Sequence, residues 1–492
     1  MRVLLLSMPD AFEHMPPIAI RMPNGAIVSL AGNVDPHHRV VTADLVLVPQ
    51  RVRETVSALL REHQPDVAGL SVMTFQRRTA LKIAALIREQ RPSAAIVVGG
   101  YDPSLAPEAY ADPALPIDVI VRGEGDVTLR ELLRAIESGT GLGGVRGVWW
   151  RDGDRFVANP ARPVSPASAI RPPDRGSRVL HGYTLLGRQV DVVETSRGCT
   201  FDCSFCSIVE MRGRNFHPFP IDRVLADIAD ARARGARAIF LVDDNIMLDV
   251  KRFAELCRAI VDHRLNDVRY VVQAMTSSLA NHGEELAPLM RRANFRYVFL
   301  GIENVIDEDL AFLRARAKNR ERATGGNASL RATALVRRHG MYVVGGLIIG
   351  NPGDTAESIE ANLGFARAHV DWPYIQHPTP YPGTPMTQDL RAQNLIAHDR
   401  VHEYDGTTSV VVNGALDAEE IEFRRWRAER WMKVRHFPRA LRDNPAFVLR
   451  HARSMFAHTF RGCTWKTLLG LEDEREAFRR YKQMREGERE YL

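Results

Sequence analysis

The chain has 492 residues, 45% of them hydrophobic and 26% charged, which is an ordinary composition for folded soluble proteins. Its length exceeds what one hydrophobic core supports, so we expect two or three domains. No apolar run approaches the ~20 residues that a membrane helix needs, so no transmembrane segment is expected. The first nine residues lack a cleavage site and predict a strand rather than a signal peptide. Five cysteines, three of them close together, suit a reducing cytoplasm.

The net charge of +6 is concentrated near the C-terminus. From Glu419 onward, 18 Lys or Arg face 12 Asp or Glu, so this segment accounts for the whole balance. A basic segment can contact an anionic partner, a membrane surface or nucleic acid. The solvated faces of amphipathic helices explain the charge more simply. No recognised nucleic-acid module is present, so no stable nucleic-acid complex is expected.

Residues 1–140 alternate apolar strands with amphipathic helices. Strands are expected over residues 3–6, 40–47, 67–72, 94–98 and 118–121, and helices over 51–62, over 78–90 and from Asp126. The alternation predicts a doubly wound, Rossmann-like α/β domain with ligands over the carboxyl ends of its strands. The loops at those ends are residues 7–9, 71–75, 99–103 and 123–126. No G-x-G-x-x-G motif opens the first helix, which disfavours dinucleotide binding.

Residues 141–189 are predicted to be a connection. Apolar flanks around Asp152-Gly153 predict a β-hairpin. The proline-rich residues 159–175 that follow suit an extended linker.

Residues 190–400 contain six further strand–helix units. Strands are expected over residues 190–193, 238–242, 268–274, 297–302, 342–349 and 374–378. Six such units predict a complete or partial (β/α)6 barrel, in which chemistry takes place at the carboxyl ends of the strands. Polar or small residues at those ends are Asp243, Asp244, Gln273, Glu303 and Gly350. Residues 401–492 have helical periodicity with interleaved aromatic residues and are predicted to form a helical cap.

Cys199, Cys203 and Cys206 form a C-x3-C-x2-C array directly after the first strand of this barrel. Thiolates this close can converge on one iron–sulfur centre, and Gly198 allows a sharp turn before the first thiol. A disulfide is disfavoured, because it joins two cysteines and the local set has three. A structural zinc site takes four ligands, and only His217, which precedes a proline, lies nearby as a fourth. Three ligands leave one iron of a four-iron cluster open.

The array, with the aromatic Phe205 before its last cysteine, resembles the signature of radical S-adenosylmethionine (SAM) enzymes. The resemblance implies that Cys199, Cys203 and Cys206 hold a catalytic 4Fe–4S cluster. Its open iron would chelate SAM, whose reductive cleavage gives a 5′-deoxyadenosyl radical. The downstream matches are residues 240–245, 301–303, 346–350 and 381–385. They imply that Phe205, Asp243, Asp244, Gln273, Glu303 and Gly350 lie around SAM.

Residues 97–107 and 119–126 resemble the cobalamin-binding domain that precedes many radical SAM cores. The resemblance implies cobalamin contacts from the loops that carry Ser71, Thr74, Gly99, Gly100, Tyr101, Gly123, Glu124 and Gly125. One departure concerns the cobalt ligand. The nearest string to Asp-x-His-x-x-Gly is Asp35-Pro-His37-His38, which lacks the glycine and precedes a strand. We therefore expect His37 and His38 to be turn residues and cobalamin to bind without a histidine ligand.

Together these resemblances imply a cobalamin-binding radical SAM enzyme of the cytoplasm. The favoured reaction is methylation of an unactivated carbon in a small-molecule or lipid-like substrate. Oxidative cyclisation or rearrangement with the same cofactors, as in the anaerobic cyclase branch, is the alternative. A non-catalytic cobalamin sensor or carrier is disfavoured because sensing needs no open iron. Flavodoxin or ferredoxin is the expected class of electron donor.

Overall fold

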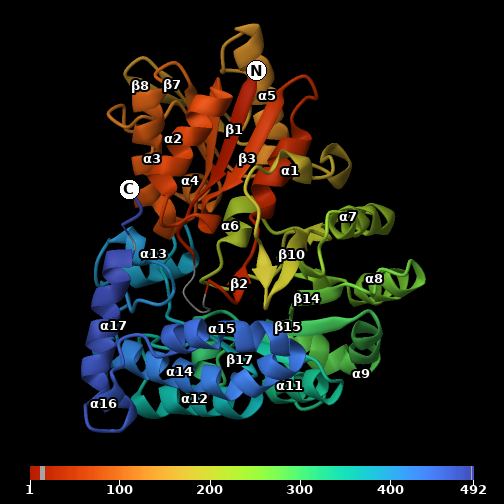
Figure 1. The fold of residues 1–492 in the computed structure, drawn as a ribbon, viewed down its shortest axis with the longest axis vertical. Helices are drawn as coiled ribbons and strands as arrows, with labels where there is room; N and C mark the ends of the chain where they lie inside the picture. Colours follow the sequence, from red (N-terminus) through yellow and green to blue (C-terminus); the bar gives the residue numbers. More distant parts are fainter. Residues whose placement is uncertain (12–16, 489) are drawn as a thin grey trace.

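Two sheets organise the chain in the computed structural model, which describes residues 1–11, 17–488 and 490–492. The N-terminal α/β unit lies at the top of Figure 1, and the curled second sheet with the C-terminal helices lies below it. None of the helices in the described residues is long and apolar enough to cross a membrane.

The first sheet has the order β3-β1-β4-β5-β6-β7-β8. Its parallel strands are β1 (Arg2–Ser7), β3 (Arg39–Asp44), β4 (Val67–Ser71), β5 (Ala95–Gly99) and β6 (Val119–Val121). The hairpin of β7 (Val148–Asp152) and β8 (Arg155–Ala158) continues the sheet in antiparallel sense. The predicted doubly wound sheet is confirmed, and its strand order reverses beside β1, where open α/β sheets bind ligands.

Helices cover both faces of this sheet. They are α1 (Gly25–Asn33), α2 (Val52–His63), α3 (Arg77–Gln90) and α5 (Gly125–Ser138). Along β1, Leu4 and Leu6 enter the core beneath α2 and α3, whereas Val3 and Leu5 enter the core beneath α1 and α5. This burial on both faces is why the strand reads as a continuous apolar run. The register aligns Ser7 with Ser71 and Ser71 with Gly99, so the predicted loops share one edge.

The second sheet has the order β17-β16-β15-β14-β13-β10-β9-β2. Its six parallel strands are β10 (Arg188–Val193), β13 (Ala238–Leu241), β14 (Arg269–Ala274), β15 (Phe295–Glu303), β16 (Tyr342–Ile348) and β17 (Trp372–Gln376). The helices that connect them are α7 (Ile221–Ala233), α8 (Val250–Asp262), α9 (Thr276–Arg292), α11 (Ser329–Arg338) and α12 (Ala356–His369). The predicted partial barrel is confirmed.

Two short antiparallel strands extend the open side of the barrel sheet. They are β9 (Thr184–Leu185) and β2 (Ile20–Arg21), with Ile20 aligned with Leu185. Strand β2 comes from the N-terminal unit, so this unit supplies one strand to the sheet of the other (Figure 1).

The C-terminal region is helical, as predicted. It contains α14 (Ala418–Asp443), α15 (Pro445–Thr459), α16 (Trp465–Leu468) and α17 (Glu474–Glu488). Helix α14 covers the free edge of β17, where the Glu429 carboxylate accepts a 3.3 Å hydrogen bond from the Ile375 amide. A free strand edge leaves unpaired amides, so this contact stabilises the end of the sheet.

An extended strap between residues 159 and 178 joins the two units. Arg175 is 4% exposed on this strap, and its guanidinium pairs with Asp191 at 3.1 Å, Asp230 at 3.2 Å and also Asp227. Two of these carboxylates come from α7 and one from β10, so Arg175 ties the strap to two elements of the barrel.

We expect Arg175→Met to destabilise the barrel strongly, because it leaves the buried side of Asp227 without its cation. Asp191 keeps Arg178, and Asp230 keeps Arg234. Breaking a buried ion pair from one side costs about 3–5 kcal/mol, which corresponds to a melting midpoint lower by about 6–20 °C in a domain of this size. Thermal unfolding followed by fluorescence measures the shift. Arg232→Met is the matched control, because the 2.7 Å pair of Arg232 with Asp267 is exposed and should shift the midpoint by about 4 °C at most. Equal shifts in the two variants would contradict the assignment.

Candidate active site

Three thiols lie on the loop that follows β10. Cys203 is buried, and Cys199 and Cys206 are partly buried among apolar side chains that include Phe205, Leu313 and Ile348. Burial raises the pKa of the Cys203 thiol to about 11 and that of Cys206 to about 12, so both stay protonated at neutral pH until a metal displaces the proton.

The three thiols lie near one another. Cys199 contributes to the raised pKa of Cys203, and Cys203 and Cys199 contribute to that of Cys206. Three thiolates are one fewer than a closed structural zinc site takes, and in a four-iron cluster they leave one iron open. The donor set therefore fits the group that the sequence predicts.

Two aspartates that follow β13 stabilise this loop through hydrogen bonds. Both oxygens of Asp243 accept hydrogen bonds from the loop, from the Thr195 amide at 2.6 Å and the Thr195 and Ser196 hydroxyls at 2.5 Å each. Burial raises the pKa of Asp243 to about 7 despite these bonds. Asp244 accepts a 2.8 Å bond from the Gly198 amide. Asp243 and Asp244, which were expected to lie around SAM, thus form hydrogen bonds with the cysteine loop itself.

Gly198 turns the chain just before the first thiol. Its φ is +92°, a region that side chains rarely adopt. A Cβ at this position would lie 2.6 Å from the Asn215 carbonyl oxygen. The position therefore requires glycine for two independent reasons.

Glu303 ends β15 next to the thiols and pairs with Lys318. Glu303 has a φ of +58°, beside a register shift between β15 and β16. A Cβ at Gly301 would lie 2.6 Å from the Glu303 carboxylate and 3.0 Å from the Lys318 ammonium, so this glycine makes room for the pair. Burial opposes the charge of Lys318, but Glu303, Cys203 and Cys206 outweigh it and raise its pKa. The ammonium lies 5.7 Å from the centre of the Phe205 ring.

The other residues at the carboxyl ends of the barrel strands differ in what they contact. The Asn245 amide lies 3.6 Å from the Cys199 sulfur and 3.7 Å from that of Met275. Gln273 is partly buried at the end of β14, and its side chain makes no hydrogen bond to the described residues. Gly350 lies against α14, since a Cβ there would be 2.7 Å from Ile421, and its amide donates to Asp354 at 2.6 Å.

The N-terminal unit meets the cysteine loop through buried charges. Arg197 pairs with Asp126 at 2.7 Å, with Glu194 at 2.8 Å and with Glu124 at 3.5 Å. Arg212 lies 3.3 Å from Glu124 and 3.6 Å from Asp244. Both carboxylate oxygens of Glu124 are buried without a hydrogen-bond partner, as are Nε and Nη1 of Arg212. Polar atoms in this state suit a site that receives a polar ligand.

The glycine loops of the N-terminal unit also face this interface. Gly100 has a φ of +108°, and a Cβ there would lie 2.7 Å from the Val72 carbonyl oxygen. Tyr101 begins α4 (Tyr101–Leu105), which contacts α6 (Ile208–Arg212) of the cysteine loop region. Burial and the nearby Asp244 raise the pKa of Tyr101, whose surroundings also include Cys206.

The other predicted residues of the N-terminal unit lie on the same edge of its sheet. The Ser104 hydroxyl accepts a 3.0 Å bond from the Gly123 amide and donates to the Gly100 carbonyl at 2.6 Å, so it joins the two glycine loops. Ser71 ends β4, Thr74 is buried in the turn after it, and Glu124 and Gly125 start α5.

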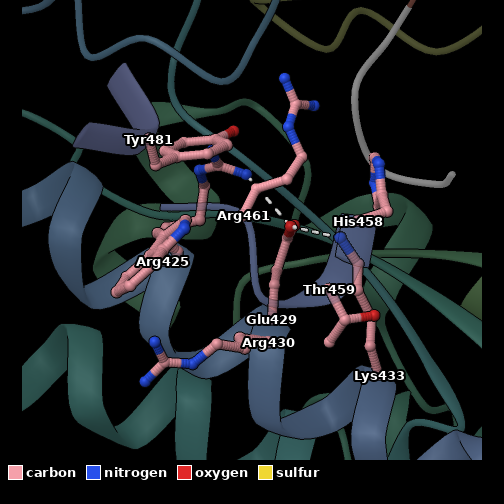
Figure 2. Close-up of a pocket in the computed structure, with 9 residues that line it drawn as sticks. Arg425, Glu429, Arg430, Lys433, His458, Thr459, Arg461 and Tyr481 are labelled. Atoms are coloured by element: carbon pink, nitrogen blue, oxygen red, sulfur yellow. Dashed lines mark ion pairs between the residues drawn. The ribbon is translucent and has the colours of Figure 1, made fainter. Parts of the chain in front are cut away.

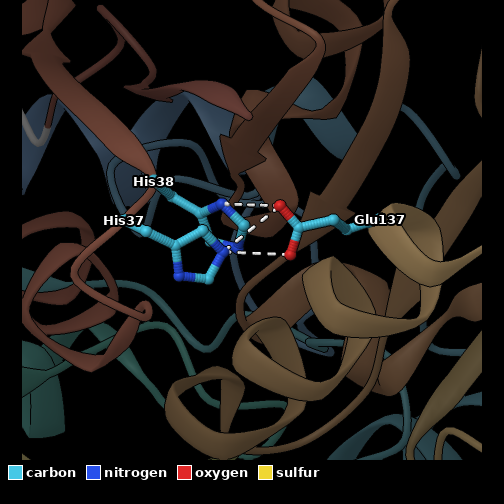
Figure 3. A group of neighbouring side chains, drawn as sticks. All are labelled: His37, His38 and Glu137. Atoms are coloured by element: carbon cyan, nitrogen blue, oxygen red, sulfur yellow. Dashed lines mark hydrogen bonds and ion pairs between the residues drawn. The ribbon is translucent and has the colours of Figure 1, made fainter.

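His37 and His38 lie elsewhere, as Figure 3 shows with their neighbour Glu137. They occupy the turn before β3, at the amino edge of the sheet, as expected for turn residues. The His37 ring donates a hydrogen bond to the Glu137 carboxylate at 2.9 Å, and His38 lies 3.8 Å from the same carboxylate. The sheet separates this group from the glycine loops at its carboxyl edge.

Sequence reasoning did not find Lys318 or Ser104. Lys318 lies in a short turn, residues Ala317–Asn319, with no periodic pattern around it. Ser104 sits in a five-residue helix that the sequence does not announce. Cys257 lies outside the site, in the core beneath α8, where it is 1% exposed.

Comparisons with known proteins place both units in known families. Residues 193–366 match the radical SAM superfamily, and residues 18–133 match the B12 binding domain. The chain thus combines a radical SAM domain with a B12 binding domain and is homologous to cobalamin-dependent radical SAM methyltransferases and anaerobic cyclases. The cofactors of these enzymes are a 4Fe–4S cluster, SAM and cobalamin, and the donor set and buried polar atoms described above fit them.

Individual relatives of this radical SAM enzyme agree. It is 25% identical over 424 residues to an uncharacterized methyltransferase of Pyrococcus horikoshii, which covers 86% of this chain and 90% of that protein. It is 28% identical to the anaerobic magnesium-protoporphyrin IX monomethyl ester cyclase of Cereibacter sphaeroides over 69% of this chain and 55% of the cyclase.

Two solved structures share the fold of this radical SAM enzyme. The radical SAM methyltransferase TsrM of Kitasatospora setae has a TM-score of 0.64 and 21% identity, over 80% of this chain and 75% of TsrM. The cobalamin-dependent enzyme OxsB has a TM-score of 0.67 and 18% identity, over 99% of this chain and 76% of OxsB.

Gly198→Ala should impair cluster assembly without unfolding the protein, because the added methyl group clashes with the Asn215 carbonyl in the cysteine loop. We expect iron content after anaerobic reconstitution to fall below about half of the wild-type value of about four per chain. The matched control is Gly213→Ala, on the same loop with a φ of +74° but no atom nearer than 3.7 Å to the added carbon. Equal iron loss in both variants would show that positive φ alone, and not the clash, is responsible.

Proposed function

We propose that this enzyme methylates an unactivated carbon of a small-molecule or lipid-like substrate. The observation that carries the proposal is the buried contact of Arg197 and Arg212 with Glu124. It sets the cysteine loop of the barrel against the glycine loops of the N-terminal unit. When bound, the cluster with SAM supplies a hydrogen-abstracting radical, and cobalamin supplies the methyl group. A substrate between the two edges would be within reach of both.

The residues of this chain would hold and orient these groups. Cys199, Cys203 and Cys206 would bind the cluster, and the Asn245 amide would donate to the Cys199 thiolate. Glu303 and Lys318 form a carboxylate–ammonium pair beside the thiols. Such a pair matches the ammonium and carboxylate of an amino acid, so we assign it to the methionine end of SAM. Ser71, Thr74 and the glycine loops would contact cobalamin.

The methionine-end assignment predicts a separation of SAM binding from cluster content. Lys318→Met removes the cation but no thiol, so iron should stay at about four per chain. The dissociation constant of SAM should rise about tenfold or more, the cost of losing one charge-assisted bond. Calorimetric titration of the reconstituted protein with SAM measures it, and Lys318→Arg should retain part of the affinity. A Lys318→Met variant that binds SAM normally would overturn the assignment.

Oxidative cyclisation is the second candidate, because the chain also resembles the anaerobic cyclases. Methylation is favoured because the methyltransferase relative is matched over 90% of its length and that cyclase over 55%. Either reaction needs a reducing compartment and a low-potential electron donor such as flavodoxin or ferredoxin, which we include in the proposal.

Product analysis tests the proposed function. The protein reconstituted anaerobically should contain about four irons and four sulfides per chain and, with SAM, a corrinoid and a reductant, should release 5′-deoxyadenosine. Methylation consumes a second SAM as methyl donor and predicts S-adenosylhomocysteine alongside it, whereas cyclisation gives deoxyadenosine alone. Replacing all three cysteines by alanine should abolish deoxyadenosine, and its persistence would contradict the cluster assignment.

A further inference from the structure

The exposed apolar side chains of this enzyme are concentrated in one part of the C-terminal region. Among the described residues, thirteen large apolar side chains are exposed, and nine of them lie between residues 427 and 471. Leu449 is 68% exposed, Leu469 is 67% exposed and Trp465 is 63% exposed. Single exposed apolar residues are ordinary, whereas a concentration of them indicates an interaction surface. We call the exposed side chains of residues 427–471 the C-terminal face.

The C-terminal face is also basic. Residues 427–471 contain ten Lys or Arg and two Asp or Glu, a balance of +8 (10 − 2), so the rest of the chain has a balance of −2 (6 − 8). The exposed charged residues of this segment are all cations, namely Arg427, Arg435, Arg442, Arg450, Arg453 and Lys466. Of the two carboxylates, Glu429 is buried, and Asp443 pairs with Arg188 and Arg269 of the barrel.

Three of these cations have no anionic partner in the part of the chain that the structure describes. Arg450 and Arg453 on α15 and Lys466 on α16 are exposed and form no ion pair with the described residues. Their charge is therefore available to an external anionic surface.

Apolar and cationic side chains alternate along the same sides of two neighbouring helices. Helices α14 and α15 pack against each other, with α16 near one end of the pair (Figure 1). On α15, Leu449, Arg453 and Phe456 follow one another at three or four residues, so they lie on one side of the helix. On α14, Trp431 has an exposed arginine four residues before it and another four residues after it.

The inner sides of these helices are fixed, so the exposed side chains cannot turn inward. Val448 and Met455 of α15 are buried in a small apolar cluster with α14. Figure 2 shows the polar groups between the two helices, where Glu429 pairs with Lys433 at 3.6 Å beside His458 of α15. The exposure of the apolar residues is therefore a property of the packed structure.

A surface that combines leucines, aromatic rings and cations fits the interface of an anionic bilayer. Trp, Phe and Leu enter the boundary between headgroups and acyl chains, and Lys or Arg contact the anionic headgroups. A second copy of this face would bring like charges together across a symmetric interface. Nucleic acid would pair with the arginines but would leave the exposed leucines without a partner.

We propose that the C-terminal face binds this enzyme to the surface of a bilayer that contains anionic lipids. The helices would lie along the surface, with the apolar side chains in the headgroup boundary and the cations against the headgroups. This surface goes beyond the proposed methyl transfer and does not depend on it.

Vesicle flotation of the full-length, anaerobically reconstituted protein tests the proposal. We expect about tenfold or tighter binding to vesicles of about one third phosphatidylglycerol in phosphatidylcholine than to phosphatidylcholine alone, because each cation near an anionic surface contributes about fivefold. Added salt should weaken the binding. Leu469→Gln should lower the partition coefficient about tenfold, since one apolar side chain no longer enters the bilayer. The double variant Arg450→Gln, Arg453→Gln should lower binding to the anionic vesicles about tenfold or more.

Matched controls come from outside the C-terminal face. Leu330→Gln replaces a leucine that is 56% exposed on α11, and Arg53→Gln replaces an exposed arginine of α2. Both variants should bind vesicles like the wild type.

Absence of binding to the anionic vesicles, equal affinity for both kinds of vesicle, or equal losses in the controls and in the variants of the face would overturn the proposal. Without vesicle binding, a dimer that Leu469→Gln separates would assign the face to a second copy. Binding of single-stranded RNA that only the double arginine variant weakens would instead assign it to nucleic acid. The product analysis of the cysteine loop is independent of these results.

Discussion

The buried ion pairs of Arg197 are the interaction on which the rest of the active site depends. Arg197 directly precedes Gly198 and Cys199, and its partners Glu124 and Asp126 stand at the start of α5 in the other unit. Burial opposes the charge of Arg197, but Glu194, Asp126 and Glu124 together raise its pKa well above the ordinary value. A cation so held fixes the distance between two cofactor-binding edges that the chain could otherwise place independently.

The carboxylates around the active site have two different roles. Asp243 and Asp244 bond the backbone and hydroxyl groups of the cysteine loop, whereas Glu303 pairs with a lysine and Glu124 stands between two arginines. The first pair shapes the loop that presents the thiols. The second pair has a geometry suited to polar ligands. The strand ends of the two sheets thus carry both scaffolding and binding residues.

Local signals in the sequence account for the parts that could be predicted. The thiol spacing, Gly198, the apolar strands and the Gly99-Gly100 turn are encoded within a few residues, and the structure places them as expected. Helix α1 was missed because it is short, has a glycine near each end and is apolar on nearly every side between them, so it gives no amphipathic pattern. Local propensity does not predict the first half of α9, because the serines, Asn281 and Gly283 within Thr276–Arg292 are poor helix formers. Burial against neighbouring helices sustains it.

Long-range partners could not be predicted. Lys318 follows Glu303 by fifteen residues and Arg175 precedes its α7 partners by more than fifty, and nothing near either residue announces the ion pair. Such pairings depend on how the elements pack, and a single sequence records only the elements. Gly350 shows both kinds of cause, because its φ is +87° and a Cβ there would also lie 2.7 Å from Ile421 of a helix far along the chain.

The placement of β2 has a consequence for how the protein is made. Ile20 and Arg21 are synthesised early, yet their partner strand contains Leu185 and Thr184. During synthesis this segment must wait for about 160 residues to emerge before its backbone can pair, which raises the contact order of the fold and slows its completion. An N-terminal unit produced alone would carry an unpaired strand, and a barrel produced alone would lack one. Each unit is therefore a poor candidate for independent expression, because separation removes a strand from a sheet that both build.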